Sequence, residues 1–198
     1  WQYEYGEGKF GTKVTTQQDA ISYGRLSYGA KLDGSSVIQF DGVSRPYVAQ
    51  KNNIKNFYNT GKTFTNTVAF TGGSDVLNFR FSVSDLNDKG IVPNNTLDKK
   101  IANLNVNAKL GKNLSVEAVG QYNVENNLNR PGLGDALGNP NWGTYMIANS
   151  VDIRSLAPGY DANGNEILWN SSGFATNPYF TINRFQQKDT KNRFIGYA

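Results

Sequence analysis

The stretches Ile101–Leu110 (IANLNVNAKL) and Leu114–Val124 (LSVEAVGQYNV) alternate between apolar and polar residues. In the first, the even positions are apolar and the odd positions from Asn103 to Lys109 are polar; in the second, the even positions again carry most of the apolar residues. A period of two is typical of a β-strand with one apolar and one polar face. Only Gly111–Asn113 separates the stretches, which predicts an antiparallel hairpin over residues 99–124.

A similar hairpin is predicted upstream, over residues 64–86. Phe64, Val68 and Phe70 share one parity before a turn at Gly72–Asp75, and positions 77, 79, 81 and 83 are apolar after it. Each strand is near the roughly 9 to 11 residues that cross a bilayer at a tilt. The turns inside the hairpins are short, whereas the link over 87–98 is longer and the segment 125–188 is longer still. This asymmetry is typical of outer-membrane barrels.

These patterns predict an all-β fold: a segment of an antiparallel up-and-down transmembrane β-barrel with long extracellular loops. Four strands and the start of a fifth over 189–198 cannot close a barrel, so we expect the chain to be part of a larger assembly. Trp1 follows neither an initiator Met nor an apolar leader, and we expect that it is not the natural beginning.

The composition excludes several classes of chemistry. The 198 residues include no His and no Cys, which removes disulfides, thiolate metal sites and the Ser-His-Asp and Cys-His forms of catalysis. No catalytic residue, metal or cofactor is predicted, and the protein is not expected to be an enzyme. The net charge of +4 is spread without a basic stripe, so no nucleic-acid partner is expected. One small cluster near the end is either a solvated surface or a contact with lipid phosphates: Arg184, Lys188, Lys191 and Arg193.

The remaining segments are predicted to be largely irregular. Residues 1–63 are expected to hold a strand end at Trp1–Tyr5 and then a long folded loop with one short strand at Ser36–Phe40. In the loop 125–188, helical spacing predicts a short helix over Trp142–Asn149, and Asn163–Gly164 predicts a small hairpin turn. Four oxygen-bearing residues beside that turn suggest calcium, but they do not complete the spacing of an EF-hand loop: Asp161, Asn163, Asn165 and Glu166.

Two sets of side chains are candidates for solute contact. The first is the aromatic residues of the 125–188 loop, which are either platforms for sugar rings or peptide side chains or a small core that holds the loop together: Trp142, Tyr145, Tyr160, Trp169 and Phe174. The second is the polar face of the strands, expected to face the barrel lumen: Arg80, Asn105, Asn107, Glu117 and Gln121. Four residues of opposite parity are expected to face lipid: Leu104, Val106, Val116 and Ala118.

An ordered series of short motifs resembles the SusC/RagA family of TonB-dependent outer-membrane transporters. The resemblance covers essentially the whole chain, and its strength lies in the order of the motifs rather than in any one of them. The sequence departs from the family in its extent. No signal peptide, TonB-contacting segment or plug domain is visible in it. The motifs are Tyr3–Gly8, Lys31–Gly34, Arg45–Tyr47, Asn56–Gly61, Phe64–Gly73, Asn78–Ser82, Asp88–Ile91, Asn177–Tyr179 and Asn192–Gly196.

The resemblance implies a barrel of about 22 strands in the outer membrane of a Gram-negative bacterium. It implies import of a bulky nutrient, an oligosaccharide or a peptide, driven by the TonB complex acting on a plug. A SusD-like surface lipoprotein would be the partner at the extracellular mouth. The alternative from a different class is a soluble β-sandwich carbohydrate-binding module, in which the apolar strand faces pack against each other.

Overall fold

The computed structural model describes all residues, Trp1–Ala198, and they form two compact units. Unit 1 combines Trp1–Asn59 with Pro131–Gln186, and unit 2 combines Thr60–Arg130 with Gln187–Ala198. Most of the regular structure is antiparallel β-sheet, accompanied by a few short helices. None of the helices is long and apolar enough to cross a membrane.

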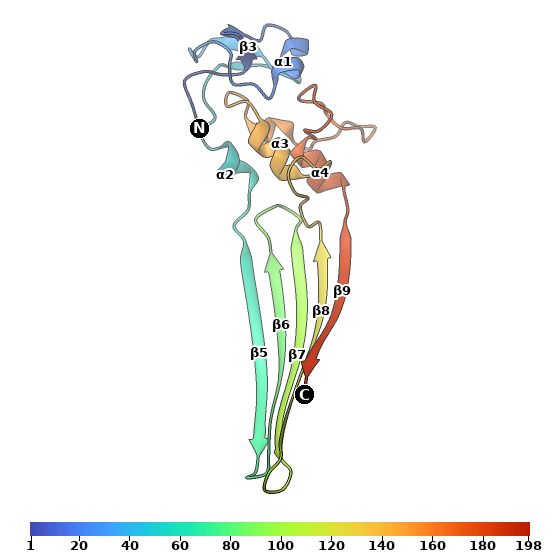
Figure 1. The fold of residues 1–198 in the computed structure, drawn as a ribbon. Coiled ribbons are helices and arrows are strands. Elements are labelled where there is room, and N and C mark those ends of the chain that lie inside the picture. The colour runs from blue at the N-terminus through green and yellow to red at the C-terminus, as the bar shows by residue number, and fades with distance from the viewer. The chain divides into compact units, whose positions relative to one another are not determined.

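Unit 2 is a single open sheet of five antiparallel strands that lie side by side in chain order (Figure 1). The strands are β5 (Lys62–Gly73), β6 (Leu77–Lys89), β7 (Thr96–Lys109), β8 (Ser115–Leu128) and β9 (Lys188–Tyr197). The predicted all-β antiparallel meander is therefore confirmed for this unit. The sheet does not close on itself, because β5 and β9 each have one neighbour.

The strands extend beyond the alternating stretches that predicted them. The expected loop over 87–98 is wrong in extent, because Asn87 pairs with Asp98 and the ladder continues to the pair Lys89–Thr96. Backbone pairing does not need apolar side chains, so polar residues prolong both strands. The turn is thereby reduced to Gly90–Asn95, closed by a hydrogen bond from the Gly90 N–H to the Asn95 carbonyl (3.0 Å).

The register gives the sheet one apolar and one polar face. Directly opposite residues of an antiparallel pair share a face, and one row across the sheet joins Phe70, Phe81, Leu104, Gly120 and Gly196. Apolar side chains dominate the neighbouring rows of this face and are exposed, Phe70 to 62% and Leu104 to 46%. Unit 2 therefore leaves its apolar face without a packing partner.

The opposite face carries a network of side-chain hydrogen bonds. Thr67 and Ser84 hydroxyls are 2.8 Å apart, and the Asn103 amide donates to Ser82 Oγ (3.4 Å). Lys99 and Glu125 form an ion pair at 2.9 Å on the same face. This face can therefore satisfy its polar groups partly within the sheet.

Unit 1 holds the hydrophobic core of the protein. A larger cluster includes Phe40, Phe57, Ile153, Leu156 and Trp169, and a smaller one consists of Val14, Ala20, Val37 and Tyr47. Short elements surround these clusters: β1 (Gly8–Lys9), β2 (Thr12–Lys13), α1 (Gln17–Tyr23), β3 (Ser36–Ile38), β4 (Ser44–Pro46), α2 (Asn53–Phe57), α3 (Pro140–Met146), a 3₁₀ turn (Ile153–Leu156) and α4 (Pro178–Arg184).

Two expectations for unit 1 are corrected. Trp1–Tyr5 is not a strand: Gln2 Oε1 accepts from the backbone N–H groups of Glu4 and Tyr5 (2.9 Å each) and bends the chain. The segment 9–63 contains α1, α2 and two small hairpins, and the expected strand at 36–38 is one arm of the second hairpin. The helix expected over Trp142–Asn149 exists as α3, displaced toward Pro140 because the Asn139 side chain caps the Asn141 N–H (3.1 Å).

Asn177 connects three segments of unit 1 through its buried side chain. Its Oδ1 caps α4 by accepting from the Tyr179 N–H (3.0 Å), and its Nδ2 donates to the carbonyls of Leu156 (3.2 Å) and Ile167 (3.1 Å). The residue is 0% exposed. Its amide thus satisfies backbone groups that no regular element pairs.

Asn177→Ala is expected to destabilise unit 1 by roughly 2 to 4 kcal/mol, since the cap is worth about 1 kcal/mol and two buried carbonyls lose their donor. All three Trp residues lie in unit 1, so tryptophan fluorescence during urea unfolding measures this unit. Asn183→Ala is the control, because its exposed amide makes one hydrogen bond, to the Pro158 carbonyl (3.0 Å). Equal midpoints for the two variants would contradict the role given to Asn177.

Candidate functional site

The loop aromatics divide between core and surface. Trp169 is 1% exposed and belongs to the main core, and Trp142 packs against the same cluster. The prediction that Trp169 offers a platform to a solute is therefore wrong for this structure, because neighbouring apolar residues cover its ring. For these two residues the small-core interpretation holds.

The other three aromatics are more accessible. Tyr145 is 50% and Phe174 65% exposed, and the Tyr160 ring lies 4.0 Å from the Arg184 guanidinium carbon in a cation–π contact. None of the five predicted aromatics lines the pocket found in unit 1. The five aromatics therefore do not form one site.

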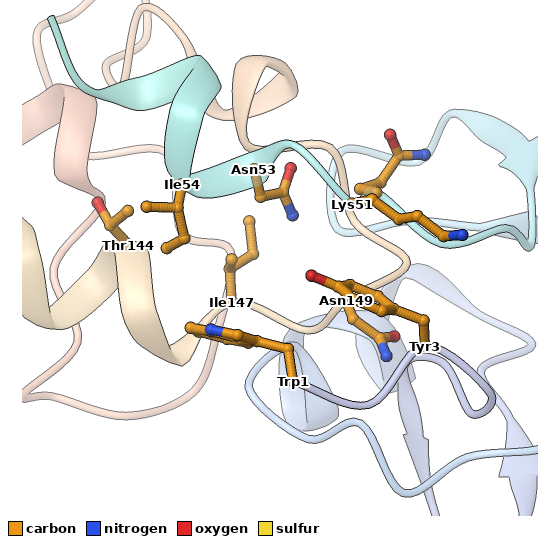
Figure 2. Close-up of a pocket in the computed structure, with 9 residues that line it drawn as sticks. Trp1, Tyr3, Lys51, Asn53, Ile54, Thr144, Ile147 and Asn149 are labelled. Carbon is orange, nitrogen blue, oxygen red and sulfur yellow. The ribbon is translucent and has the colours of Figure 1, made fainter. Parts of the chain in front are cut away.

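The pocket of unit 1 lies between three segments: the first residues of the chain, the stretch that leads into α2, and the end of α3 with the residues after it (Figure 2). Its cavity volume is about 20 Å³, room for about one water molecule. The indole of Trp1 and the phenol of Tyr3 form one side, and the α2 stretch forms the other. The lining residues are Trp1, Tyr3, Gln50, Lys51, Asn53, Ile54, Thr144, Ile147 and Asn149.

Asn149 joins the three segments beneath the pocket. Its Nδ2 donates to the Gln2 carbonyl (2.8 Å), and its own carbonyl accepts from the Gln50 N–H (2.7 Å). Its backbone N–H donates to Ser27 Oγ (3.0 Å). The Oδ1 of the same side chain is buried and has no hydrogen-bond partner. The pocket therefore has a fixed floor with one unsatisfied acceptor.

The walls combine aromatic area, amides and a single positive charge. Tyr3 is 40% exposed. Lys51 Nζ lies 5.9 Å from the Tyr3 ring centre, and no acidic residue lines the pocket. Asn53 has a structural role, because its amide bonds the Val151 carbonyl (2.7 Å) and the Ile153 N–H (2.9 Å).

The sequence interpretation missed this pocket. The alternation of Trp1, Tyr3 and Tyr5 predicted a strand, and the partners of these rings lie about 50 and 145 residues away along the chain. The available signal was the unusual density of aromatic residues in WQYEY within an otherwise polar segment.

The predicted lumen residues do share one face of the sheet in unit 2. Arg80 pairs with Asn105, and Asn107 with Glu117. Gln121 lies opposite Asn103, two residues from Asn105, on the same face. The register thus groups the five side chains on one face of the sheet, as predicted.

The carboxylate oxygens near the turn at Asp161 accept hydrogen bonds from within the protein. Asp161 Oδ1 accepts from the backbone N–H groups of Asn163 (2.9 Å) and Asn165 (2.8 Å), and Glu166 Oε1 accepts from the Asn177 N–H (2.5 Å). These hydrogen bonds hold the pKa of Asp161 below its usual range. The predicted hairpin is present only as one bridge, between Tyr160 and Glu166.

Glu7 is an isolated acid in the interior of unit 1. The residue is fully buried, and neither carboxylate oxygen has a partner. Its carbonyl accepts from the Tyr47 hydroxyl (2.7 Å), and its N–H donates to Ser150 Oγ (2.7 Å). Burial raises the pKa of Glu7 to about 8, since desolvation disfavours the charged form. The acid is closed off from solutes and is largely neutral at pH 7.

No protein-family model and no curated protein sequence matches this chain.

Glu7 is expected to make the stability of unit 1 depend on pH. Its carboxyl ionises at an ordinary pKa of 4.5 in the unfolded chain and near 8 in the folded one. Between these values the folded state holds a proton that the unfolded state lacks, so stability falls as pH rises. Glu7→Gln keeps the shape and should remove this fall, roughly 3 to 5 kcal/mol in total, in urea unfolding measured from pH 4.5 to 8.5.

The control is Glu4→Gln, three residues earlier. Glu4 is exposed and pairs with Lys31 at 2.8 Å on the surface, so this variant should keep the pH dependence of the parent chain. A Glu7→Gln chain whose stability falls as steeply as that of the parent would show that Glu7 is ionised in the folded state.

Proposed function

We propose that the chain is a segment of an outer-membrane barrel that imports a bulky nutrient through a TonB-dependent mechanism. The observation that carries the proposal is the two-faced open sheet of unit 2. Its apolar face is exposed over several rows, while its other face is polar and hydrogen-bonded. Such a sheet is stable where lipid covers one face and water the other.

The dimensions of the apolar face support a membrane setting. Apolar rows extend from the pair Val83–Ala102 to Leu110 and Leu114. The eight residue steps from Ala102 to Leu110 span roughly 26 Å. This is about 20 Å along the membrane normal at a tilt near 40°. The next row on this face beyond the Val83–Ala102 pair carries the Asp85–Lys100 ion pair (3.0 Å). A charged pair directly beyond the apolar rows fits the edge of a hydrocarbon layer.

The alternative of a soluble β-sandwich module has less support. A sandwich needs a second sheet whose apolar side covers the first. The other two sheets are small hairpins, β1–β2 and β3–β4, each strand only two or three residues long. Phe194 remains 72% and Val68 59% exposed on the face that a second sheet would bury.

The resemblance to SusC/RagA transporters supports the rest of the proposal. On this view the sheet belongs to a barrel of about 22 strands, and β5 and β9 pair with further strands. A SusD-like lipoprotein covers the extracellular mouth of the barrel, and the solute is an oligosaccharide or a peptide.

The proposal predicts that Leu104→Lys destabilises the membrane-inserted protein by roughly 2 to 4 kcal/mol, because a cation near the midplane loses its hydration. Asn105→Lys is the matched control one residue away on the opposite face, and it should change stability little. Urea unfolding from lipid vesicles measures both. A full-length protein that stays soluble and monomeric without detergent, or equal effects of the two variants, would contradict the barrel.

The proposal also predicts the orientation in the membrane. The chain has no Cys, so single cysteines can be placed at will. Asn163→Cys should react with a membrane-impermeant maleimide in intact cells, and Lys112→Cys should react only after the outer membrane is opened. Strong labelling at 112 with none at 163 would mean that the barrel has the opposite orientation.

A further inference from the structure

We propose that a row of lysines on the apolar face of the unit 2 sheet binds a membrane lipid whose headgroup ends in phosphate monoesters. The row consists of Lys62, Lys89 and Lys188, which are far apart in the sequence. This inference rests on the proposed function, because it needs lipid against the apolar face. It adds a bound lipid to the transported solute.

The strand register brings the three lysines together at one edge of the apolar face. Lys62 lies directly opposite Lys89, and the same row continues through Thr96 and Leu128 to Lys188. An even number of residues separates each lysine from the apolar positions of its own strand, so all three share the face of the apolar rows. Lys89 and Lys188 are three strand spacings apart, roughly 14 Å.

The register also divides the basic cluster near the end of the chain. Lys188 has the parity of Phe194 and lies on the apolar face, whereas Lys191 and Arg193 lie on the polar face. Arg184 belongs to α4 in unit 1. Of the three cations on β9, only Lys188 is therefore on the side of the apolar rows, where its row partners come from β5 and β6.

The three lysines have no anionic partner in the chain. All three are exposed, and none of them forms an ion pair. Like charges directly opposite each other destabilise an antiparallel sheet. The repulsion between Lys62 and Lys89 is therefore uncompensated within the chain, and a bound anion would relieve it.

Charge on the apolar face is confined to the end away from the hairpin turns at 74–76 and 110–114. From the Val83–Ala102 row to those turns, the strands carry no charged residue on this face. Asp85 already pairs with Lys100 (3.0 Å), which leaves three lysines and one carboxylate, Asp98. A face that is cationic at one end only fits a leaflet with anionic headgroups on that side. The charged residues of this face are Lys62, Lys89, Lys100, Lys188, Asp85 and Asp98.

The row lies at the height of lipid headgroups. Lys89 follows Asp85 by four residues on β6, roughly 13 Å along the strand, or about 10 Å along the membrane normal at a tilt near 40°. The headgroup layer on each side of a bilayer is roughly 5 to 8 Å thick. A flexible lysine stem can bend back across part of that distance, which brings the ammonium groups to the phosphates.

The close lysine pair selects a phosphate monoester. Opposite residues of an antiparallel pair have Cβ atoms roughly 5 Å apart, so Lys62 and Lys89 can reach one anion. A monoester carries about 1.5 to 2 negative charges and three acceptor oxygens, whereas a phosphodiester carries a single charge. The monoester therefore compensates both ammonium groups. Lys188 is placed for a second phosphate of the same headgroup, as in the diphosphorylated disaccharide of lipid A.

The test is the affinity of the full-length protein in detergent for lipids, measured by microscale thermophoresis. The probes are diphosphoryl lipid A, the same lipid with both phosphates removed, and cardiolipin, whose two phosphates are diesters. We expect lipid A to bind about fivefold more tightly than cardiolipin. The double variant Lys62→Gln with Lys89→Gln should weaken lipid A about twentyfold, since each lysine near the surface contributes about fivefold. It should leave the dephosphorylated lipid unaffected.

The matched control is Lys191→Gln with Arg193→Gln, which removes two cations from the polar face of β9 and should change the affinity for lipid A little. Inorganic phosphate should not displace lipid A, because acyl chains on the apolar rows contribute to binding. Displacement by inorganic phosphate would mean a site for the free ion and would overturn the inference.

The inference would also be overturned by equal losses in the two double variants, by an unchanged affinity without Lys62 and Lys89, by equal binding of cardiolipin and lipid A, or by no binding of lipid A. A protein that passes the Leu104→Lys test but gives one of these results refutes this inference alone. A protein that fails the Leu104→Lys test refutes the proposed function, whatever its affinity for lipid A.

Discussion

The uninterrupted antiparallel ladder from β5 to β9 is the constraint on which unit 2 depends. Pairing runs through Lys62–Gly73 and onward across each later strand without an inserted residue. Opposite residues share a face, so the parity of one strand is imposed on the next. A slip of one residue would mix apolar and polar side chains on both faces. The ladder thus produces a sheet with two distinct surfaces and no interior of its own.

Unit 1 depends on buried asparagines instead. Its segments are mostly irregular, and buried backbone groups without a regular partner must find another one. Asn53, Asn149 and Asn177 are each at most 7% exposed and bond backbone groups of other segments. An amide has both a donor and an acceptor, so a single side chain can join two segments. This framework fixes the pocket, because Asn149 and Asn53 hold its floor and its α2 side.

The hairpins and the two faces of the sheet were predicted from the sequence, because apolar and polar residues alternate in a strand whose two faces have different environments. The sequence did not predict the strand ends, where polar residues continue the ladder without a pattern. Helix α1 buries only Ala20 and so has no apolar periodicity, although Thr16 and Asp19 carry the spacing of a capping pair. Asn177–Pro178 was a similar signal for α4.

The pocket could not be predicted, because its walls come together only through long-range contacts, and the burial of Trp169 reflects a core assembled from both halves of unit 1.

The split composition of unit 1 has a consequence for how the chain folds. Its two halves are separated by Thr60–Arg130, and bringing them together in an unfolded chain means closing a long loop, with an entropic penalty that grows with loop length. The hairpins of the sheet need only short turns, and we expect them to form first. Once they have formed, Lys62 and Leu128 lie in one row, three strand spacings apart, or roughly 14 Å. The paired strands thereby replace a long flexible loop with a short fixed span. We therefore expect unit 1 to fold after β5 to β8 have paired.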